Sequence, residues 1–180
     1  DRRIESSSKK FEQIQNWPTI THRQLRFVVA PVQPISYDCV MNIVLDTSVL
    51  VAAMRSNTGA SFAVLNLVPS TTFTFALTVT LYTEWQAVLT RAENIPEGLD
   101  SDDMLGFLRY LASKASLHDV HYLWRPMLRD PNDDMVLECA VTAQAEHIVT
   151  HNIRDFRGAE KFGVTAMTPS EFLKKIRSTS

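Results

Sequence analysis

The chain has 180 residues, a hydrophobic content of 45%, a charged content of 21% and a formal net charge of −2. These values are typical of a soluble globular protein with one core, and no apolar run is long enough to cross a bilayer. Cys39 and Cys139 are the only cysteines, which excludes a disulfide framework. A polar start without a secretory signal favours a cytoplasmic protein.

Residues 1–40 differ from the rest of the chain. They carry six Lys/Arg and four Asp/Glu, whereas the remainder carries twelve and sixteen, so the two parts have net charges of +2 and −4. No sustained hydrophobic period appears in the first part, although 25–30 could form one short strand. We interpret 1–40 as an upstream extension, with a partner-binding tail as the alternative, and expect the folded domain to span 41–180.

From Met41 onward, apolar strand-like runs alternate with segments of helical period. The strand-like runs lie at 42–45, 72–77, 116–120, 147–150 and 164–167. The helical segments lie at 49–54, 61–67, 80–91, 100–114, 134–144 and 169–176, with Ser48 as the expected cap of the first. This alternation predicts an α/β fold, a three-layer α/β/α sandwich around a parallel sheet of about five strands.

Three carboxylates stand out against that predicted fold. Asp46 follows the first strand directly, and ligands of open α/β sheets bind beyond the carboxyl ends of strands. Glu84 lies on the inward stripe of a predicted helix, where a carboxylate is costly unless it is paired or bound to a metal. Asp134 opens a later helix, beside Asp133. Each has an ordinary alternative: a helix cap, a glutamate at the solvent rim, or acids that complement a helix dipole.

The next strand adds Asn152 and Asp155 just after its carboxyl end. Crowded carboxylates repel one another, and hard divalent cations relieve that repulsion, so oxygen ligands alone favour Mg²⁺ or Mn²⁺ over zinc. Two such ions can activate water and stabilise a displaced phosphodiester. Arg154, Arg157 and Lys161 follow nearby, where they suit either phosphate positioning or a solvated loop.

Other chemistries have weaker support. His118 and His121 would point to opposite faces of a strand, and no cysteine is near to complete a zinc site. The chain contains neither a glycine-rich phosphate loop nor a Gly-x-Ser-x-Gly nucleophile elbow. Small-molecule phosphoryl transfer usually needs a second aspartate where Ser48 stands.

Five segments together resemble the PIN-domain family, in particular its bacterial toxin branch related to VapC-type toxins. They are 42–50 (NIVLDTSVL), 81–89 (LYTEWQAVL), 129–138 (RDPNDDMVLE), 148–156 (IVTHNIRDF) and 167–173 (MTPSEFL). The resemblance covers 41–176 and is carried by the order and spacing of the segments. It implies a compact α/β/α sandwich, Mg²⁺- or Mn²⁺-dependent RNA cleavage, frequent homodimerisation and an antitoxin partner.

The resemblance also assigns residues. Asp46, Glu84 and Asp134 match the first three acids of the family and are the expected catalytic and metal-binding residues. Asn152 stands where the family often has a fourth acid, which puts a second metal in doubt, and Asp155 or Asp133 is the expected substitute. The expected supporting hydroxyls are those of Thr47, Ser48 and Thr150.

Two hypotheses about function remain open at this point. The first is a metal-dependent endoribonuclease, the toxin of a toxin–antitoxin system. The second is a catalytically weak or inactive PIN-fold module that binds protein or RNA, which would not need a crowded acidic rim. The apolar stretch from Met104 to Trp124 further predicts a helical surface for a dimer or an antitoxin.

Overall fold

The computed structural model describes residues 40–120, 128 and 133–179. Within them, five strands form a parallel sheet in the order β3-β2-β1-β4-β5. The strands are β1 (Met41–Leu45), β2 (Phe73–Thr78), β3 (Ser116–His118), β4 (His147–Val149) and β5 (Thr165–Met167). All five predicted strands are present, each within two residues of its expected bounds.

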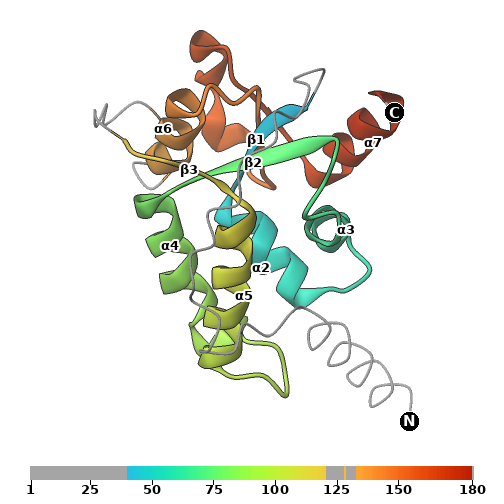
Figure 1. Cartoon of the computed structure of the whole chain (residues 1–180), viewed down its shortest axis with the longest axis vertical. Coiled ribbons are helices and arrows are strands. Elements are labelled where there is room, and N and C mark those ends of the chain that lie inside the picture. The colour runs from blue at the N-terminus through green and yellow to red at the C-terminus, as the bar shows by residue number, and fades with distance from the viewer. Residues whose placement is uncertain (1–39, 121–127, 129–132, 180) are drawn as a thin grey trace, which may run out of the picture.

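Six α-helices connect and cover these strands in the described part of the chain. They are α2 (Thr47–Arg55), α3 (Ala60–Asn66), α4 (Val79–Leu89), α5 (Ser101–Lys114), α6 (Asp134–Thr142) and α7 (Pro169–Thr179). Helices α3 and α7 pack side by side, as do α4 and α5, while α6 contacts β1, β2 and β4 (Figure 1). The predicted α/β fold is therefore confirmed.

The middle strand, β1, is enclosed on both faces. Ile43, Val44 and Leu45 are fully buried, as expected for a central parallel strand covered on both faces. Aromatic contacts fix two helices on β2: the ring centroids of Phe75 and Trp85 are 6.5 Å apart, and Phe73 meets Phe172 edge-on at 5.1 Å. This packing holds the ends of β1 and its neighbours at one rigid edge.

The start of α2 differs from the prediction. Ser48 is not the helix cap, because α2 already begins at Thr47 and Asp46 is the last extended residue, with ψ 150°. The strand therefore passes into the helix without a loop. As a result, the Asp46 side chain accepts no bond from the helix amides and is available to other groups.

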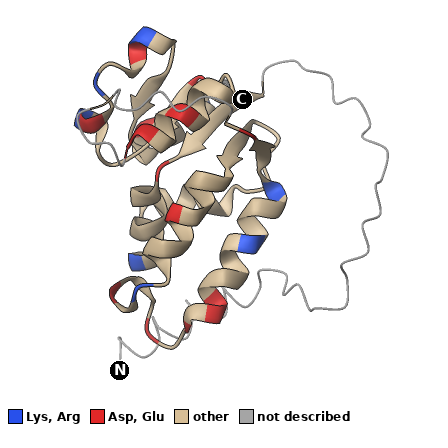
Figure 2. Ribbon diagram, turned by 90° about the vertical axis from the view of Figure 1, so that its left-hand side faces the viewer, with Lys and Arg blue, Asp and Glu red and all other residues tan. Residues whose placement is uncertain are grey.

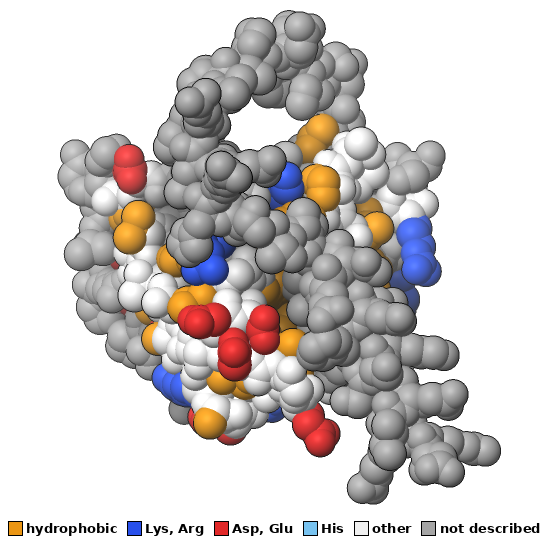
Figure 3. All heavy atoms as spheres, turned by 60° about the horizontal axis from the view of Figure 1, so that its bottom comes forward, with side chains coloured by type: hydrophobic (Ala, Val, Ile, Leu, Met, Phe, Trp, Pro, Cys, Tyr) orange, Lys and Arg blue, Asp and Glu red, His pale blue; other side chains and the backbone are white. Residues whose placement is uncertain are grey.

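Helix α5 begins as predicted, with a full capping box. The Asp100 side chain accepts from the amides of Asp102 and Asp103, and the Asp103 side chain accepts from the Asp100 amide. Figure 3 views the molecule from the end that lies lowest in Figure 1 and shows acidic side chains gathered there. Capping and the helix dipole account for acids in the first turn of α5 without any catalytic role.

In the described part of the stretch from Met104 to Trp124, the expected apolar surface is limited to Leu117 on β3, which is 70% exposed. Met104, Phe107, Leu108 and Leu111 are buried in the core, because α5 turns its apolar stripe against α4. Two 3₁₀ helices that the sequence did not predict, η2 (Ile153–Phe156) and η3 (Ala159–Phe162), occupy the segment between β4 and β5.

Some expectations fall outside the described residues. They are the extension at 1–39, the short strand at 25–30, His121, and the turn at 130–132. None of the helices that the structure describes combines the length and apolar character needed to span a membrane.

Candidate functional site

The site begins with Asp46, at the carboxyl end of the central strand β1. Its amide donates to the Val149 carbonyl of β4 at 3.0 Å, and the register pairs Leu45 with Val149. The residues that follow these two strands, Asp46 and Thr150, are therefore neighbours across the sheet edge. The Asp46 side chain is only 5% exposed, so its charge needs partners.

Two hydroxyls supply those partners. Ser48 Oγ donates to Asp46 Oδ2 at 2.5 Å, and Thr150 Oγ1 donates to the same oxygen at 2.6 Å. Thr150 Oγ1 in turn accepts from the Asn152 amide at 2.9 Å. Such short bonds are typical of hydroxyl donors to a carboxylate. Oδ1 of Asp46 has no hydrogen bond within the described part of the chain, so the carboxylate has one held oxygen and one open oxygen.

Glu84 lies on α4, which leaves the same sheet edge directly after β2. Its neighbours Leu81 and Trp85 are fully buried, whereas Glu84 itself is half-buried, between the core stripe and solvent. No hydrogen bond or ion pair to the Glu84 carboxylate occurs among residues 40–120, 128 and 133–179. The carboxylate therefore remains available to an external cation or ligand.

Asp134 is the first residue of α6 and is 1% exposed. Its Oδ1 accepts the amide of Leu128 at 2.8 Å. That bond gives Asp134 a structural role, because it ties the start of α6 to the chain that precedes it. Asp133 precedes it as the half-buried cap residue.

The topology directs all three acids toward one edge. Helix α4 starts at the carboxyl end of β2, and α6 precedes the parallel strand β4, so α6 also begins at that edge. However, no group of three or more His, Cys, Asp and Glu in the described residues lies close enough together to hold one ion. The oxygen donors suit a hard cation, but the sharing of one ion by Asp46, Glu84 and Asp134 stays a prediction.

The remaining predicted site residues surround this edge. Thr47 opens α2, and Asn152 and Asp155 lie after β4, with Asp155 half-buried in η2. The three predicted phosphate-binding residues are exposed in the segment between β4 and β5; they are Arg154, Arg157 and Lys161. Figure 2 shows acidic and basic positions interspersed over the ribbon rather than segregated by sign.

Sequence reasoning missed two residues. Glu138 is a buried carboxylate, 7% exposed, one helical turn after Asp134 on α6. The spacing of four residues could have revealed it, because residues four apart share a helix face. His151 was also missed: its Nε2 lies 2.7 Å from the buried Ser61 Oγ, a contact between residues 90 apart that no sequence pattern indicates.

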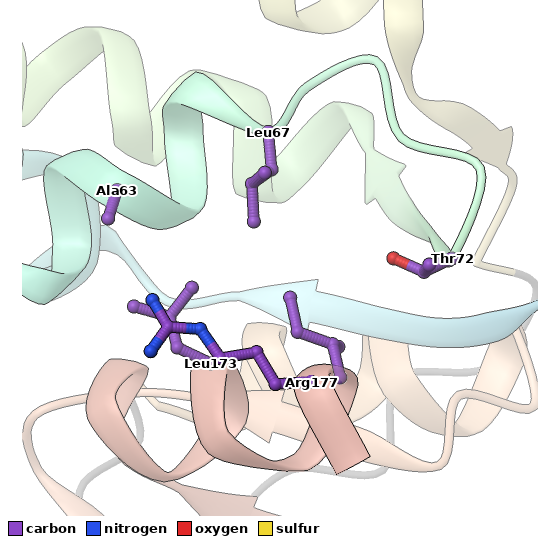
Figure 4. A pocket seen from close by; sticks show the side chains of 6 residues that line it. Ala63, Leu67, Thr72, Leu173 and Arg177 are labelled. Atoms are coloured by element: carbon purple, nitrogen blue, oxygen red, sulfur yellow. The ribbon is translucent and has the colours of Figure 1, made fainter. Parts of the chain in front are cut away.

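Two other features do not form part of this site. Burial raises the pKa of the Cys139 thiol to about 12, although hydrogen bonding to Thr78 partly opposes the rise, so this cysteine is a poor nucleophile. A cavity of about 400 Å³ lies between α3 and α7 (Figure 4). Thr72 lines it just before β2, at the amino edge of the sheet, and the lining includes no carboxylate.

Comparison with known proteins identifies the family of the chain and its fold. The family model described as "PIN domain" matches residues 42–154, so the chain belongs to the PIN-domain family. The match begins with β1 and ends just after Asn152, and it therefore contains Asp46, Glu84 and Asp134. No curated protein sequence gives a significant match.

Two solved structures share the fold. One is VapBC-1 from nontypeable Haemophilus influenzae, with 13% identity, a TM-score of 0.51, and coverage of 72% of this chain and 99% of that chain. The other is VapBC2 from Rickettsia felis bound to a DNA fragment from their promoter, with 16% identity, a TM-score of 0.50, and coverage of 71% and 98%. At these identities the likeness shows the shared fold alone.

Proposed function

We propose that the protein is a metal-dependent endoribonuclease and the toxin of a toxin–antitoxin system. The observation that carries the proposal is the Asp46 carboxylate, buried at the carboxyl end of the central strand with Oδ2 held by two hydroxyls. A carboxylate needed only for helix capping would accept helix amides instead. The Asp46 carboxylate is instead oriented by hydroxyl groups that bond to Oδ2. Supporting hydrogen bonds of this kind orient a carboxylate that binds a metal ion or acts as a general base.

Mg²⁺ or Mn²⁺ fits the donor set, since the candidate ligands Asp46, Glu84, Asp134 and Asp155 offer only oxygen atoms. Such an ion, when bound, supplies a Lewis acid and lowers the pKa of a water molecule near the phosphodiester. Ser48 and Thr150 hold the Asp46 oxygen in place. Asp133 and Asn152 are the proposed supporting groups, and Arg154, Arg157 and Lys161 are the proposed phosphate contacts.

The proposed partners follow from the same assignment. The two solved neighbours are VapBC assemblies, which supports a cognate antitoxin protein for this chain. We further propose an RNA substrate, a homodimer, and action in the cytoplasm, where such a substrate is found. Residues 1–40 are proposed to lie outside the nuclease domain, which begins at Met41.

The proposal is tested by RNA cleavage with Mg²⁺, with Mn²⁺ and with a chelator. Asp46→Asn keeps the shape of the side chain but removes its charge, so the rate should fall about a hundredfold or more, and affinity for the ion should fall with it. Asp102→Asn is the matched control, because Asp102 is an exposed acid on α5 with no side-chain bond to the site. Equal cleavage by the Asp46 variant, or cleavage that survives the chelator, contradicts the proposal.

The alternative is a PIN-fold module that binds protein or RNA without cutting it. The half-buried position of Glu84 and the lack of a gathered trio of acids in the described residues favour this alternative. The same experiment separates the two: the module would bind RNA or a partner with no cleavage under any ion condition.

A further inference from the structure

His151 is held at the site edge from two directions. Its amide donates at 3.2 Å to Ser48 Oγ, the hydroxyl that bonds to Asp46. Its ring Nε2 lies 2.7 Å from Ser61 Oγ on α3. The residue is nevertheless exposed. An exposed imidazole is ordinarily mobile, whereas this ring is held by Ser61, and the backbone of His151 is held by the hydroxyl that bonds to Asp46.

The Ser61–His151 pair does not form a nucleophile of the serine-hydrolase kind. Ser61 is 3% exposed, so its hydroxyl is covered and cannot reach a substrate. A triad also needs a third group on the other ring nitrogen, and in the described residues no side chain or carbonyl bonds to His151 Nδ1. The hydroxyl therefore supports the ring, and Nδ1 is the atom left for an external partner.

The protonation of the ring favours an anionic partner. When Ser61 Oγ donates to Nε2, the neutral ring carries its proton on Nδ1, and when the ring is cationic both nitrogens donate. Nδ1 is thus a donor in these two states, whereas in the other neutral tautomer Nε2 donates to Ser61 Oγ and Nδ1 accepts. An anionic partner at Nδ1 selects the states in which Nδ1 donates. Exposed Arg154 lies three residues further along the chain, in η2, and adds a second cationic donor to the segment after β4.

We infer that His151 is a substrate-binding residue whose Nδ1 donates to a phosphate oxygen of RNA at the Asp46 edge, with Ser61 as its positioning residue. The inference rests on the proposed function for its choice of ligand. It adds a substrate contact at His151, the residue that directly follows Thr150. It assigns the phosphate backbone of the RNA, not a base, as the group that His151 recognises.

Two conservative substitutions distinguish this role from a structural one. The amide nitrogen of an asparagine reaches the position of Nδ1, so His151→Asn keeps the outward donor and loses the bond to Ser61. The amide of a glutamine reaches the position of Nε2, so His151→Gln keeps the bond to Ser61 and loses the outward donor. A phosphate contact requires the asparagine variant to bind better, whereas a purely structural role requires the glutamine variant to do so.

The experiment measures binding of a short fluorescein-labelled single-stranded RNA of mixed sequence to the full chain, in chelator and at low salt. His151→Gln should weaken binding about tenfold, the cost of one hydrogen bond to a charged group, and His151→Asn should weaken it less. His118→Gln is the matched control and should bind like the unsubstituted chain. His118 also bonds through Nε2 to a serine hydroxyl, that of Ser116 at 3.0 Å, but it lies on the edge strand β3.

Thermal melting checks that each variant is folded, and Ser61→Ala provides a second test that leaves the ring intact, with a smaller loss of binding expected. The inference is overturned if His151→Gln binds RNA as the unsubstituted chain does, if the glutamine variant binds better than the asparagine variant, or if the unsubstituted chain binds no RNA. Because the chelator prevents metal-dependent cleavage, a loss of binding in His151→Gln supports the inference even if the nuclease proposal itself fails.

Discussion

Thr150 and Asp46 are 104 residues apart in the sequence and are joined by a hydrogen bond of 2.6 Å between Thr150 Oγ1 and Asp46 Oδ2. Thr150 is fully buried, so the bond is shielded from water. Because the same hydroxyl accepts from the Asn152 amide, one side chain connects the end of β1 to the loop after β4. The orientation of the Asp46 carboxylate thus depends on the packing of two strands.

Thr150→Val should reduce RNA cleavage without unfolding the protein. The substitution keeps the volume and removes the hydroxyl, so Asp46 Oδ2 retains only Ser48 and the Asn152 amide loses its acceptor. Loss of a group that orients a metal ligand typically costs about 10–100-fold in activity or metal affinity. Measurement of kcat/KM together with ion titration checks this. Thr150→Ser restores a hydroxyl and should recover much of the rate; equal defects in both variants would point to packing instead.

Asp134 should show separable structural and catalytic contributions. Asp134→Ala leaves the amide of Leu128 without its acceptor, and both residues are buried, so the free energy of unfolding should fall by about 1–3 kcal/mol. Asp134→Asn keeps an oxygen in the same place and should be markedly more stable than the alanine variant, while still losing cleavage. Denaturant unfolding and RNA cleavage measure the two effects. An asparagine variant that cleaves normally would remove Asp134 from the proposed metal-binding residues.

His147 should make the protein less stable in mild acid. Its ring nitrogens are buried without a hydrogen-bond partner in the described part of the protein. Burial, and then the nearby positive charge of Lys175, lower its pKa below the ordinary 6.5, with smaller opposing effects from Glu146 and two backbone groups. Below that pH the unfolded chain binds a proton that the folded chain resists. The contribution of His147 to stability is therefore complete above 6.5 and is lost as the pH falls toward the lowered value.

The test compares urea unfolding of the natural chain and of His147→Leu at about pH 7 and about pH 5. The leucine variant removes a titrating group without removing a hydrogen bond, so it should lose less stability between the two pH values. Lys175→Met should also weaken the pH dependence, because it removes one cause of the lowered pKa. Identical pH dependence in all three proteins would show that other groups are responsible.

A chain that begins at Met41 should fold on its own. The Met41 amide donates to the Thr72 carbonyl at 3.1 Å, so the sheet begins at this residue, and the family match begins at the next one. The shortened chain should melt cooperatively near the midpoint of the full chain. A molten or insoluble product would mean that residues 1–40 contribute to the core.

The sequence alone was sufficient for the fold class. Strand and helix periods are local properties, and the fully apolar run before Asp46 marks a central strand whichever residues cover it. The Asp100 capping box was likewise predictable, because all its bonds lie within four residues. The start of α2 was not, since the pattern could not show that the chain enters the helix without a loop.

Only the tertiary structure decided how the candidate site is held together. Ser48, Thr150 and His151 reach Asp46 or its hydrogen-bonded neighbours because parallel pairing places the ends of β1 and β4 side by side. The contact of His151 with Ser61 needs, in addition, the packing of α3 against α2. Sequence determines which residues carry polar atoms and where strands end, but the partner of each polar atom is set by distances between segments far apart in the chain.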